Sequence, residues 1–372
     1  MIQGVVAQLF FIVLMAMSFY AIYQVDIHYK TGLYIKWLNV ILFVLTIYGS
    51  ILIINGNSFY KHGYVSHELN NYAYLQLIYR SVLPIYAFYY YTLKRQITSN
   101  NLFVFFLIIL ICYILMFYQS FWGHTNVSGK ENYVNNMGFL FVPLIPMLYI
   151  LRIRDIWKYL FAAVIFLFIL MSMKRGAILT GGVMLLFFIV RHLKVTSPKQ
   201  IIYIISLTVV VLYFIYTQVM DLYLNNTFFY DRLMLTLEGY SSGRDELYGF
   251  FLNYYLDRTS WTEFLFGHGA YGTVALYGNA AHNDWLEFAI NQGLIGVMLY
   301  LIYWIVFIWE WKEYKGIKEN RQALGDIIVA YFLIALFSMS FANMPISATL
   351  CIGYCLAMGQ IKVKSMKQWS PR

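Results

Sequence analysis

The sequence predicts an all-α protein, a polytopic bundle of membrane-spanning helices. Hydrophobic residues make up 61% of the 372-residue chain and charged residues only 12%, whereas soluble domains carry about 25% charged residues. The mean hydropathy is +0.63, and the apolar residues come in runs close to the roughly 20 residues that cross the hydrocarbon core as a helix. No segment alternates apolar and polar residues over the length of a strand, which argues against a β-barrel.

We expect about eleven spans (10–12) and one large, partly helical external loop. The expected spans are 2–23, 36–54, 72–92, 102–121, 138–151, 157–173, 176–190, 200–220, 284–309, 324–342 and 347–361. The longest polar stretch, 221–283, follows the eighth span. The chain therefore divides into spans 1–8 over residues 1–220, the external loop over 221–283, and the C-terminal spans with a cytoplasmic tail over 284–372.

Lysine and arginine predict the orientation, because cytoplasmic loops of membrane proteins are enriched in both. Eighteen of the 26 Lys and Arg residues lie in one set of alternate loops, namely 30–36, 94–95, 152–158, 191–199, 312–321 and 362–372. This set is expected to be cytoplasmic, with 221–283 and the N-terminus outside. The net charge of +9 is then a topology signal, so we expect no nucleic-acid partner.

The sequence predicts neither a cofactor nor a disulfide framework. Cys112, Cys351 and Cys355 lie inside apolar runs, where cysteine usually serves as a small packing residue. No set of histidines or carboxylates has the composition of a metal site. We also expect no cleavable signal peptide, because the first apolar run lacks a basic flank and is long enough to span.

The candidate chemistry lies where the external loop re-enters the membrane. His282 belongs to the stretch Ala-His-Asn-Asp-Trp-Leu-Glu over 281–287 and places a titratable ring at the expected boundary between water and bilayer. Upstream, apolar residues of 247–255 recur on one helical face, and Ser242 with Asp245 forms a start similar to a capping box. Arg244 is therefore predicted in the first turn of a helix.

A helix N-terminus with an added guanidinium is suited to bind an anion, although Arg244 could equally pair with Asp245 or Asp257. The turn over 266–272, which contains His268, is rich in glycine and lets backbone approach a ligand. Arg175, between two short spans on the predicted outer side, indicates either an anion site or a helical hairpin whose ends reach the headgroups.

Arg80 lies about eight residues into its span, roughly 12 Å deep. An arginine at this depth usually faces a polar cavity or an anion, and the alternative is that it reaches outward to the headgroups. Four outward or buried arginines with one histidine, and no set of zinc ligands, suggest a site for a polyanion such as a pyrophosphate. Aromatic side chains of the loop could stack on sugar faces or form its core; they are Tyr223, Phe228, Phe229, Tyr230, Tyr240, Tyr248, Trp261, Tyr271, Tyr277 and Trp285.

These residues resemble the bacterial O-antigen polymerase and O-antigen ligase superfamily. His282-Asn283, nine residues, Gly293, two residues and Gly296 are similar to its His-[Asn/Ser/Gln]-x9-Gly-x-x-[Gly/Thr/Tyr] signature, at the point where the largest external loop enters a membrane helix. The resemblance covers about 170–310. Weaker similarities are Ser242–Arg244, the Phe-Gly-His-Gly of 266–269, an Arg-x10-Gly pattern at Arg232 and Gly243, and a Ser-x-Ser-Arg-Gly-like segment over 171–176 in which Lys174 replaces the second serine.

The resemblance implies a GT-C-like, metal-independent, inverting glycosyltransferase in the bacterial cytoplasmic membrane. Its donor would be an undecaprenyl-diphosphate-linked glycan on the outer face, and a chain-length regulator would be a further partner. His282 would orient or deprotonate the acceptor hydroxyl, while Arg175 and Arg244 would bind the diphosphate leaving group, where preorganised cations stabilise developing charge. The expected substrate-binding residues are Arg80, Arg232, Asn283, Gly243 and His268.

Three functions remain open at this point. A polymerase, which we favour for this compact chain in O-antigen or capsule biosynthesis, would transfer the glycan to a second lipid-linked repeat unit. A ligase would transfer it to lipid A–core. A flippase would move the same lipid without forming a bond, but the sequence lacks the inverted repeats and the charges in several spans that are typical of transporters. A non-enzymatic scaffold is the remaining alternative.

Overall fold

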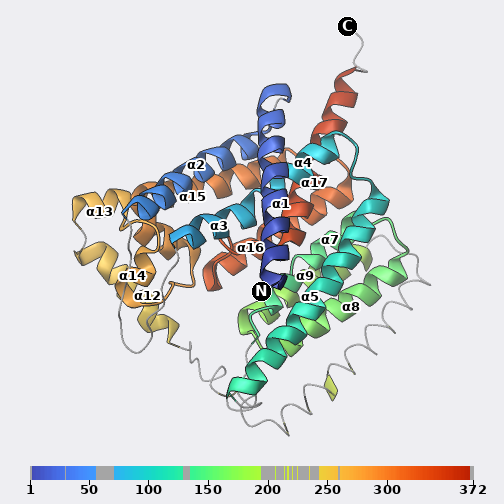
Figure 1. Cartoon of the computed structure of the whole chain (residues 1–372). Coiled ribbons are helices and arrows are strands. Elements are labelled where there is room, and N and C mark those ends of the chain that lie inside the picture. Colours follow the sequence, from blue (N-terminus) through green and yellow to red (C-terminus); the bar gives the residue numbers. More distant parts are fainter. Residues whose placement is uncertain are drawn as a thin grey trace. The chain divides into compact units, whose positions relative to one another are not determined.

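The computed structural model describes residues 2–29, 31–55, 71–128, 135–193, 243–258 and 260–368, with isolated residues between 206 and 234. The chain forms two compact units, and every regular element in the described ranges is a helix (Figure 1). The first unit comprises Met1–Ile97 with Arg244–Arg372, and the second comprises Thr98–Gly243. Each unit is described by itself.

The first unit contains most of the candidate residues. Its N-terminal helices are α1 (Ile2–His28), α2 (Leu33–Ile54), α3 (Asn71–Val82) and α4 (Pro84–Leu93). Three short helices and a π-helical turn follow in the predicted loop: α12 (Arg244–Asn253), η1 (Tyr254–Arg258), α13 (Trp261–Phe266) and α14 (Gly272–Tyr277). The C-terminal helices are α15 (Asp284–Lys312), α16 (Lys318–Phe337) and α17 (Ile346–Gln368).

The second unit packs around an aromatic core. Its helices are α5 (Ser99–Ser128), α6 (Gly138–Phe141), α7 (Leu144–Ile150), α8 (Asp155–Met171) and α9 (Arg175–Leu193). The rings of Phe141 and Phe168 stack with centroids 5.2 Å apart, and Phe117 meets Phe168 edge to face at 5.4 Å. Aromatic pairs in these geometries contribute energy beyond the area they bury.

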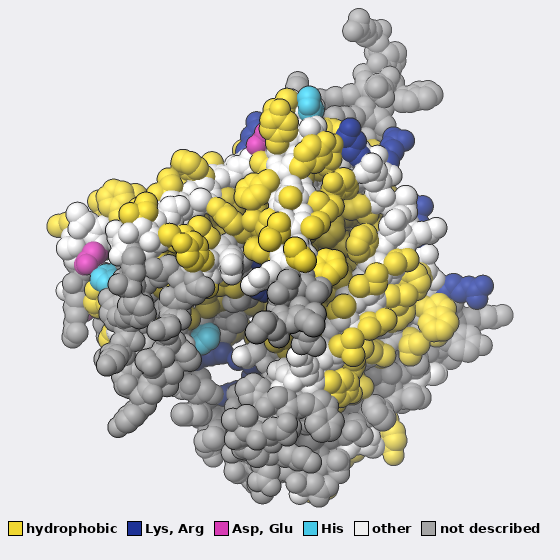
Figure 2. Space-filling model, viewed as in Figure 1, with side chains coloured by type: hydrophobic (Ala, Val, Ile, Leu, Met, Phe, Trp, Pro, Cys, Tyr) yellow, Lys and Arg dark blue, Asp and Glu magenta, His cyan; other side chains and the backbone are white. Residues whose placement is uncertain are grey.

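Five of the described helices are long and apolar enough to cross a membrane, which agrees with the predicted helical membrane protein. These are Gln8–His28, Leu33–Ile54, Ser99–Ser120, Asp284–Lys312 and Lys318–Phe337. Hydrophobic side chains cover the visible faces of α1 and α2 (Figure 2). The expected span 72–92 is divided into α3 and α4 at Pro84, because proline has no N–H to continue the helical hydrogen bonds. The count of eleven spans stays a prediction, and most of 200–243 lies outside the described residues.

Loops of the first unit that carry lysine or arginine meet at one end of its helices. The backbone N–H of Tyr34 donates to Glu310 Oε1 at 3.2 Å, so the start of α2 lies beside the end of α15. Tyr29, after α1, contacts Tyr90 near the end of α4, with ring centroids 6.2 Å apart. At the other end of α2, Tyr48 Oη donates to the carbonyl of Phe266 at 2.5 Å. The loop helices α12, α13 and α14 gather at this second end (Figure 1).

Helix α15 is divided at Gly293, which has the non-helical angles φ 67° and ψ −161°. In a straight helix, Asp284 and Tyr300 would lie roughly 24 Å apart. Instead, Tyr300 Oη donates to Asp284 Oδ2 at 2.8 Å, and the ring of Phe288 stacks on that of Tyr300 with centroids 4.4 Å apart. The segment 284–292 therefore folds back along 294–312.

This fold-back differs from the predicted straight span over 284–309. The sequence places His282 at the mouth of that span, but the structure places the start of α15 beside Tyr300. Tyr300 lies six residues past the start of the second segment, which is about 9 Å along the helix. His282 therefore lies part of the way along the second segment of α15 and not at its end.

Helix α16 ends at Phe337, earlier than the predicted span end at 342. Ser338 is extended, with φ −163° and ψ −165°. The backbone N–H groups of Ser340 and Phe341 donate to the carboxylate of Asp284 at 3.0 and 3.1 Å. These N–H groups therefore donate to Asp284 and not to the carbonyls that they would bond in a longer α16.

Candidate functional site

The stretch 281–284, which contains His282, is held at successive residues by hydrogen bonds. Glu287, only 7% exposed, accepts at Oε1 from the backbone N–H of Ala281 at 2.6 Å. Its Oε2 accepts from Thr273 Oγ1 at 2.8 Å and from Asn291 Nδ2 at 2.9 Å. One buried carboxylate therefore joins α14, α15 and the residue before His282.

A second buried carboxylate holds the other end of this stretch. Asp284 is 2% exposed and accepts hydrogen bonds from Tyr300 Oη and from the backbone and side chain of Ser340. Both acidic residues lie in the first turn of α15, where the helix dipole favours negative charge. Buried carboxylates with this many donors fix the backbone around them.

His282 itself adopts the left-handed backbone conformation, with φ 53°, which is uncommon for a residue other than glycine. Asn283 is the N-cap of α15, and its Oδ1 accepts from the backbone N–H groups of Trp285 and Leu286 at 2.9 and 3.2 Å. Asn283 Nδ2 donates to the carbonyl of Leu336 at 3.2 Å. The structure therefore gives Asn283, predicted to bind substrate, a capping role at the residue directly after the histidine.

Tyr248 connects the histidine to α12. Its Oη lies 3.2 Å from the carbonyl of His282 and 3.3 Å from the carbonyl of Leu336, and donates to these acceptors. Burial raises the pKa of Tyr248, while the guanidinium of Arg244 partly opposes this rise. The phenol therefore stays protonated and remains a hydrogen-bond donor at neutral pH.

Arg244 is the first residue of α12, which confirms the predicted helix start. Gly243 before it has φ 75°, and a Cβ there would meet nothing within 4 Å, so conformation and not space requires glycine. Leu247 and Phe251 are buried, and Phe250, Tyr254 and Tyr255 pack against them, as the predicted apolar face requires. Arg244 begins the helix whose Tyr248 donates to the backbone carbonyl of His282, so the structure brings α12 to the stretch that contains His282 and Asn283.

The glycine-rich turn packs against the break in α15. The N–H groups of His268 and Gly269 donate to the carbonyls of Ile290 and Asn291 at 2.7 and 3.0 Å, which the break at Gly293 leaves without their usual helical partners. A Cβ on Gly293 would lie 2.5 Å from the backbone N of Gly267. The glycine-rich turn, predicted to let backbone approach a ligand, thus packs closely against the backbone of α15.

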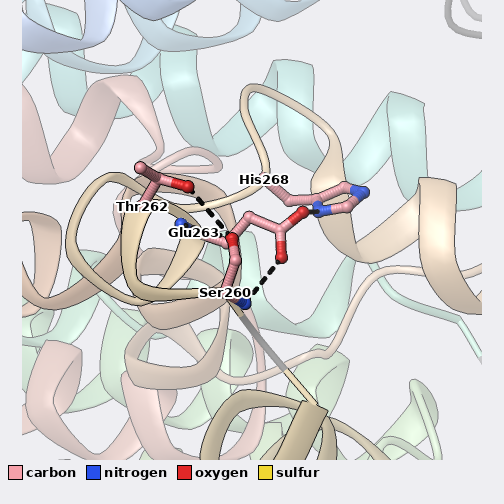
Figure 3. A network of polar contacts seen from close by, with 4 residues as sticks. All are labelled: Ser260, Thr262, Glu263 and His268. Carbon is pink, nitrogen blue, oxygen red and sulfur yellow. Dashed lines mark hydrogen bonds and ion pairs between the residues drawn. The ribbon is translucent and has the colours of Figure 1, made fainter.

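His268 belongs to a polar network beside α13 (Figure 3). Its Nδ1 lies 3.4 Å from Glu263 Oε1. Glu263 also forms a capping box with Ser260, in which each side chain bonds the backbone N–H of the other. This network closes the turn between α13 and α14.

The other predicted residues belong to another helix of the first unit, to the second unit or to the part of the chain outside the described residues. Arg80 is exposed on α3, and Ser81 beside it donates to the carbonyl of Ala342, in the segment that Asp284 holds. Arg175 begins α9 in the second unit, half-buried after Met173, which has φ 52°. Arg232 is outside the described residues. Among the residues that are described, no cluster of three or more His, Cys, Asp or Glu could hold a metal ion.

The sequence predicts Tyr248 only as one of the loop aromatics and Asp284 and Glu287 only as members of the 281–287 stretch, without the contacts that make them part of the site. Both acids stand at the start of an apolar helix, where a carboxylate needs specific partners, and this could have marked them. Tyr248 lies four residues after Arg244 and so on the same side of a helix. Its two carbonyl partners, in contrast, follow only from the tertiary fold.

The arrangement can hold a histidine in one backbone conformation, with a phenol donor on its carbonyl. Comparison of the chain with protein-family models, curated proteins and solved structures finds no match.

Proposed function

We propose that this chain is a polysaccharide polymerase of the bacterial cytoplasmic membrane, in O-antigen or capsule biosynthesis. It transfers a glycan from undecaprenyl diphosphate to a lipid-linked repeat unit on the outer face, as a metal-independent, inverting glycosyltransferase. The observation that carries this proposal is the fixed stretch 281–284, in which the carbonyl of His282 accepts from Tyr248 of α12, the helix that begins at Arg244. The His-Asn-x9-Gly-x2-Gly resemblance supplies the reaction class.

The geometry supports the roles in two ways. Two residues of the signature shape the backbone around the histidine: Asn283 caps α15, and Gly293 permits the fold-back that recesses the site. The loops with lysine and arginine meet at the opposite end of the first unit, so by the positive-inside rule the histidine end faces outward. This is the side on which we expect the lipid-linked glycan.

In the proposed reaction, the acceptor hydroxyl oxygen attacks the anomeric carbon of the donor sugar and forms the new glycosidic bond. The bond from that carbon to the diphosphate oxygen breaks with inversion, and the electron pair leaves on the lipid diphosphate. His282 accepts the proton of the acceptor hydroxyl, which typically contributes 10²–10⁴-fold to rate. Arg244, with Arg175, stabilises the charge that develops on the leaving diphosphate.

The ligase and the flippase are the alternatives. A ligase would use the same residues toward lipid A–core, and a flippase would need none of the bond-forming chemistry. The fixed backbone around His282 favours catalysis, because a transporter site must rearrange between two accessible states.

The test uses the purified full chain in proteoliposomes with a synthetic undecaprenyl-diphosphate repeat unit. We expect a ladder of longer lipid-linked products by mass spectrometry, with or without EDTA, and an Arg244→Lys variant that loses most activity because lysine lacks the planar donor fork. Product only when lipid A–core is added would indicate the ligase. Lipid movement without bond formation would indicate the flippase, and inhibition by EDTA that Mg²⁺ reverses would contradict the proposed role of the arginines.

A further inference from the structure

Helix α13 carries an apolar face that is exposed within the described part of the chain. Trp261 is 80% exposed, and Leu265, one helical turn later, and Phe266 are also exposed. Phe264, three residues after Trp261, is packed instead, because its ring stacks on Tyr255 with ring centroids 5.0 Å apart. Exposed large apolar side chains grouped in this way mark an interaction surface.

The position of α13 beside a candidate membrane span indicates what its exposed apolar side chains contact. The carbonyl of Phe266 accepts a hydrogen bond from Tyr48, which lies in the candidate membrane span Leu33–Ile54. Helix α2 continues for six residues past Tyr48, or about 9 Å, so this end of α13 lies beside the last turns of a span and not beyond them.

The neighbouring helix α2 also has an exposed apolar side, as expected for a span that contacts lipid. Exposed apolar residues follow one side of α2 up to its end; they are Phe43, Ile47, Ile51 and Ile54. Hydrophobic side chains cover α13 and the adjacent end of α2 in the same view (Figure 2).

We propose that α13 is an interfacial membrane helix, with Trp261, Leu265 and Phe266 inserted where the headgroups of the outer leaflet meet the acyl chains. Tryptophan is enriched at this depth of membrane proteins. The polar network of Ser260, Glu263 and His268 (Figure 3) supplies the polar side that such helices require. The proposal requires that the chain spans a membrane, but it does not require glycosyl transfer.

One consequence concerns the candidate site. The turn after α13 donates hydrogen bonds to the carbonyls of Ile290 and Asn291, in the same short segment as Glu287, which holds Ala281. A bilayer contact at α13 therefore stabilises the loop that ends at His282, and it keeps that loop at the surface where a lipid-linked substrate diffuses.

The test measures the depth of spin labels on the full chain in liposomes of phosphatidylethanolamine and phosphatidylglycerol. Labels are placed at Trp261→Cys and Leu265→Cys, with Ser260→Cys as the matched polar control, after the three native cysteines are replaced by alanine. We expect the first two labels to collide with oxygen more than with a water-soluble nickel chelate, at about 5–10 Å below the phosphates. The control label should show the opposite preference.

Nickel accessibility at Trp261 and Leu265 equal to that at Ser260 would overturn the proposal. If a labelled variant fails to fold, brominated lipids provide a second measurement on natural tryptophan. Fluorescence quenching should then be greater for wild type than for Trp261→Phe, and equal quenching would refute the insertion. A chain that passes the polymerisation assay but fails here would retain its proposed function and lose only this interfacial helix.

Discussion

Replacing Glu287 by glutamine tests whether a buried carboxylate holds the candidate site. Glutamine has nearly the same shape but can offer one oxygen only, whereas Glu287 uses both oxygens to accept from three donors. Its NH₂ group must therefore face at least one of the donors on Ala281, Thr273 or Asn291. A buried donor left without an acceptor costs about 1–3 kcal/mol, so we expect the free energy of unfolding to fall by about that amount.

The assay is thermal unfolding of the purified chain in one detergent, followed by circular dichroism, together with a double-mutant cycle. Thr273→Val removes one of the donors, so it should cost less in the Glu287→Gln background than in wild type. A reduced melting temperature with this coupling supports the network. An unchanged melting temperature for Glu287→Gln, or strictly additive effects of the two substitutions, would refute the reasoning.

Three further outcomes follow from the same structure. Gly293→Ala should lower the melting temperature strongly, because its φ of 67° disfavours a side chain and a Cβ would lie 2.5 Å from neighbouring backbone. The control Gly249→Ala, in a helix with nothing within 4 Å, should be neutral or slightly stabilising. Equal melting temperatures for the two variants would contradict the fold-back at Gly293. Tyr248→Phe removes a donor to two backbone carbonyls and should cost about 1 kcal/mol and lower transfer activity; wild-type stability and rate would contradict its role. A cysteine at Ser260 should react with a membrane-impermeant thiol reagent in cells whose outer membrane is permeable, and a cysteine at Lys315 should not. The reverse labelling pattern would contradict the predicted topology.

The helical class and several local elements could be predicted from the sequence, because they depend on local patterns. The apolar periodicity after Arg244 predicts α12, and the Asn283 that begins α15 is a favoured N-cap residue. The division of 72–92 at Pro84 could also be predicted from proline chemistry, although the apolar run alone predicts one span.

Other features depend on contacts between distant residues and could not be predicted in this way. Gly293 is one of 24 glycines, and its left-handed conformation becomes specific only when the 267–269 turn packs against it. The early end of α16 depends on Asp284, more than 50 residues earlier in the chain. Arg175 lies in the second unit, so its proposed part in the site stays a prediction.

The measurement that tests the central claim most directly is the rate of glycosyl transfer by His282→Ala in proteoliposomes. The matched control is His28→Ala, at the end of α1, which should retain the wild-type rate. We expect His282→Ala to keep the wild-type circular dichroism spectrum and to lose about 10²–10⁴-fold in rate, the range for a positioned general base. Transfer by His282→Ala within twofold of wild type would show that the histidine does not carry the reaction.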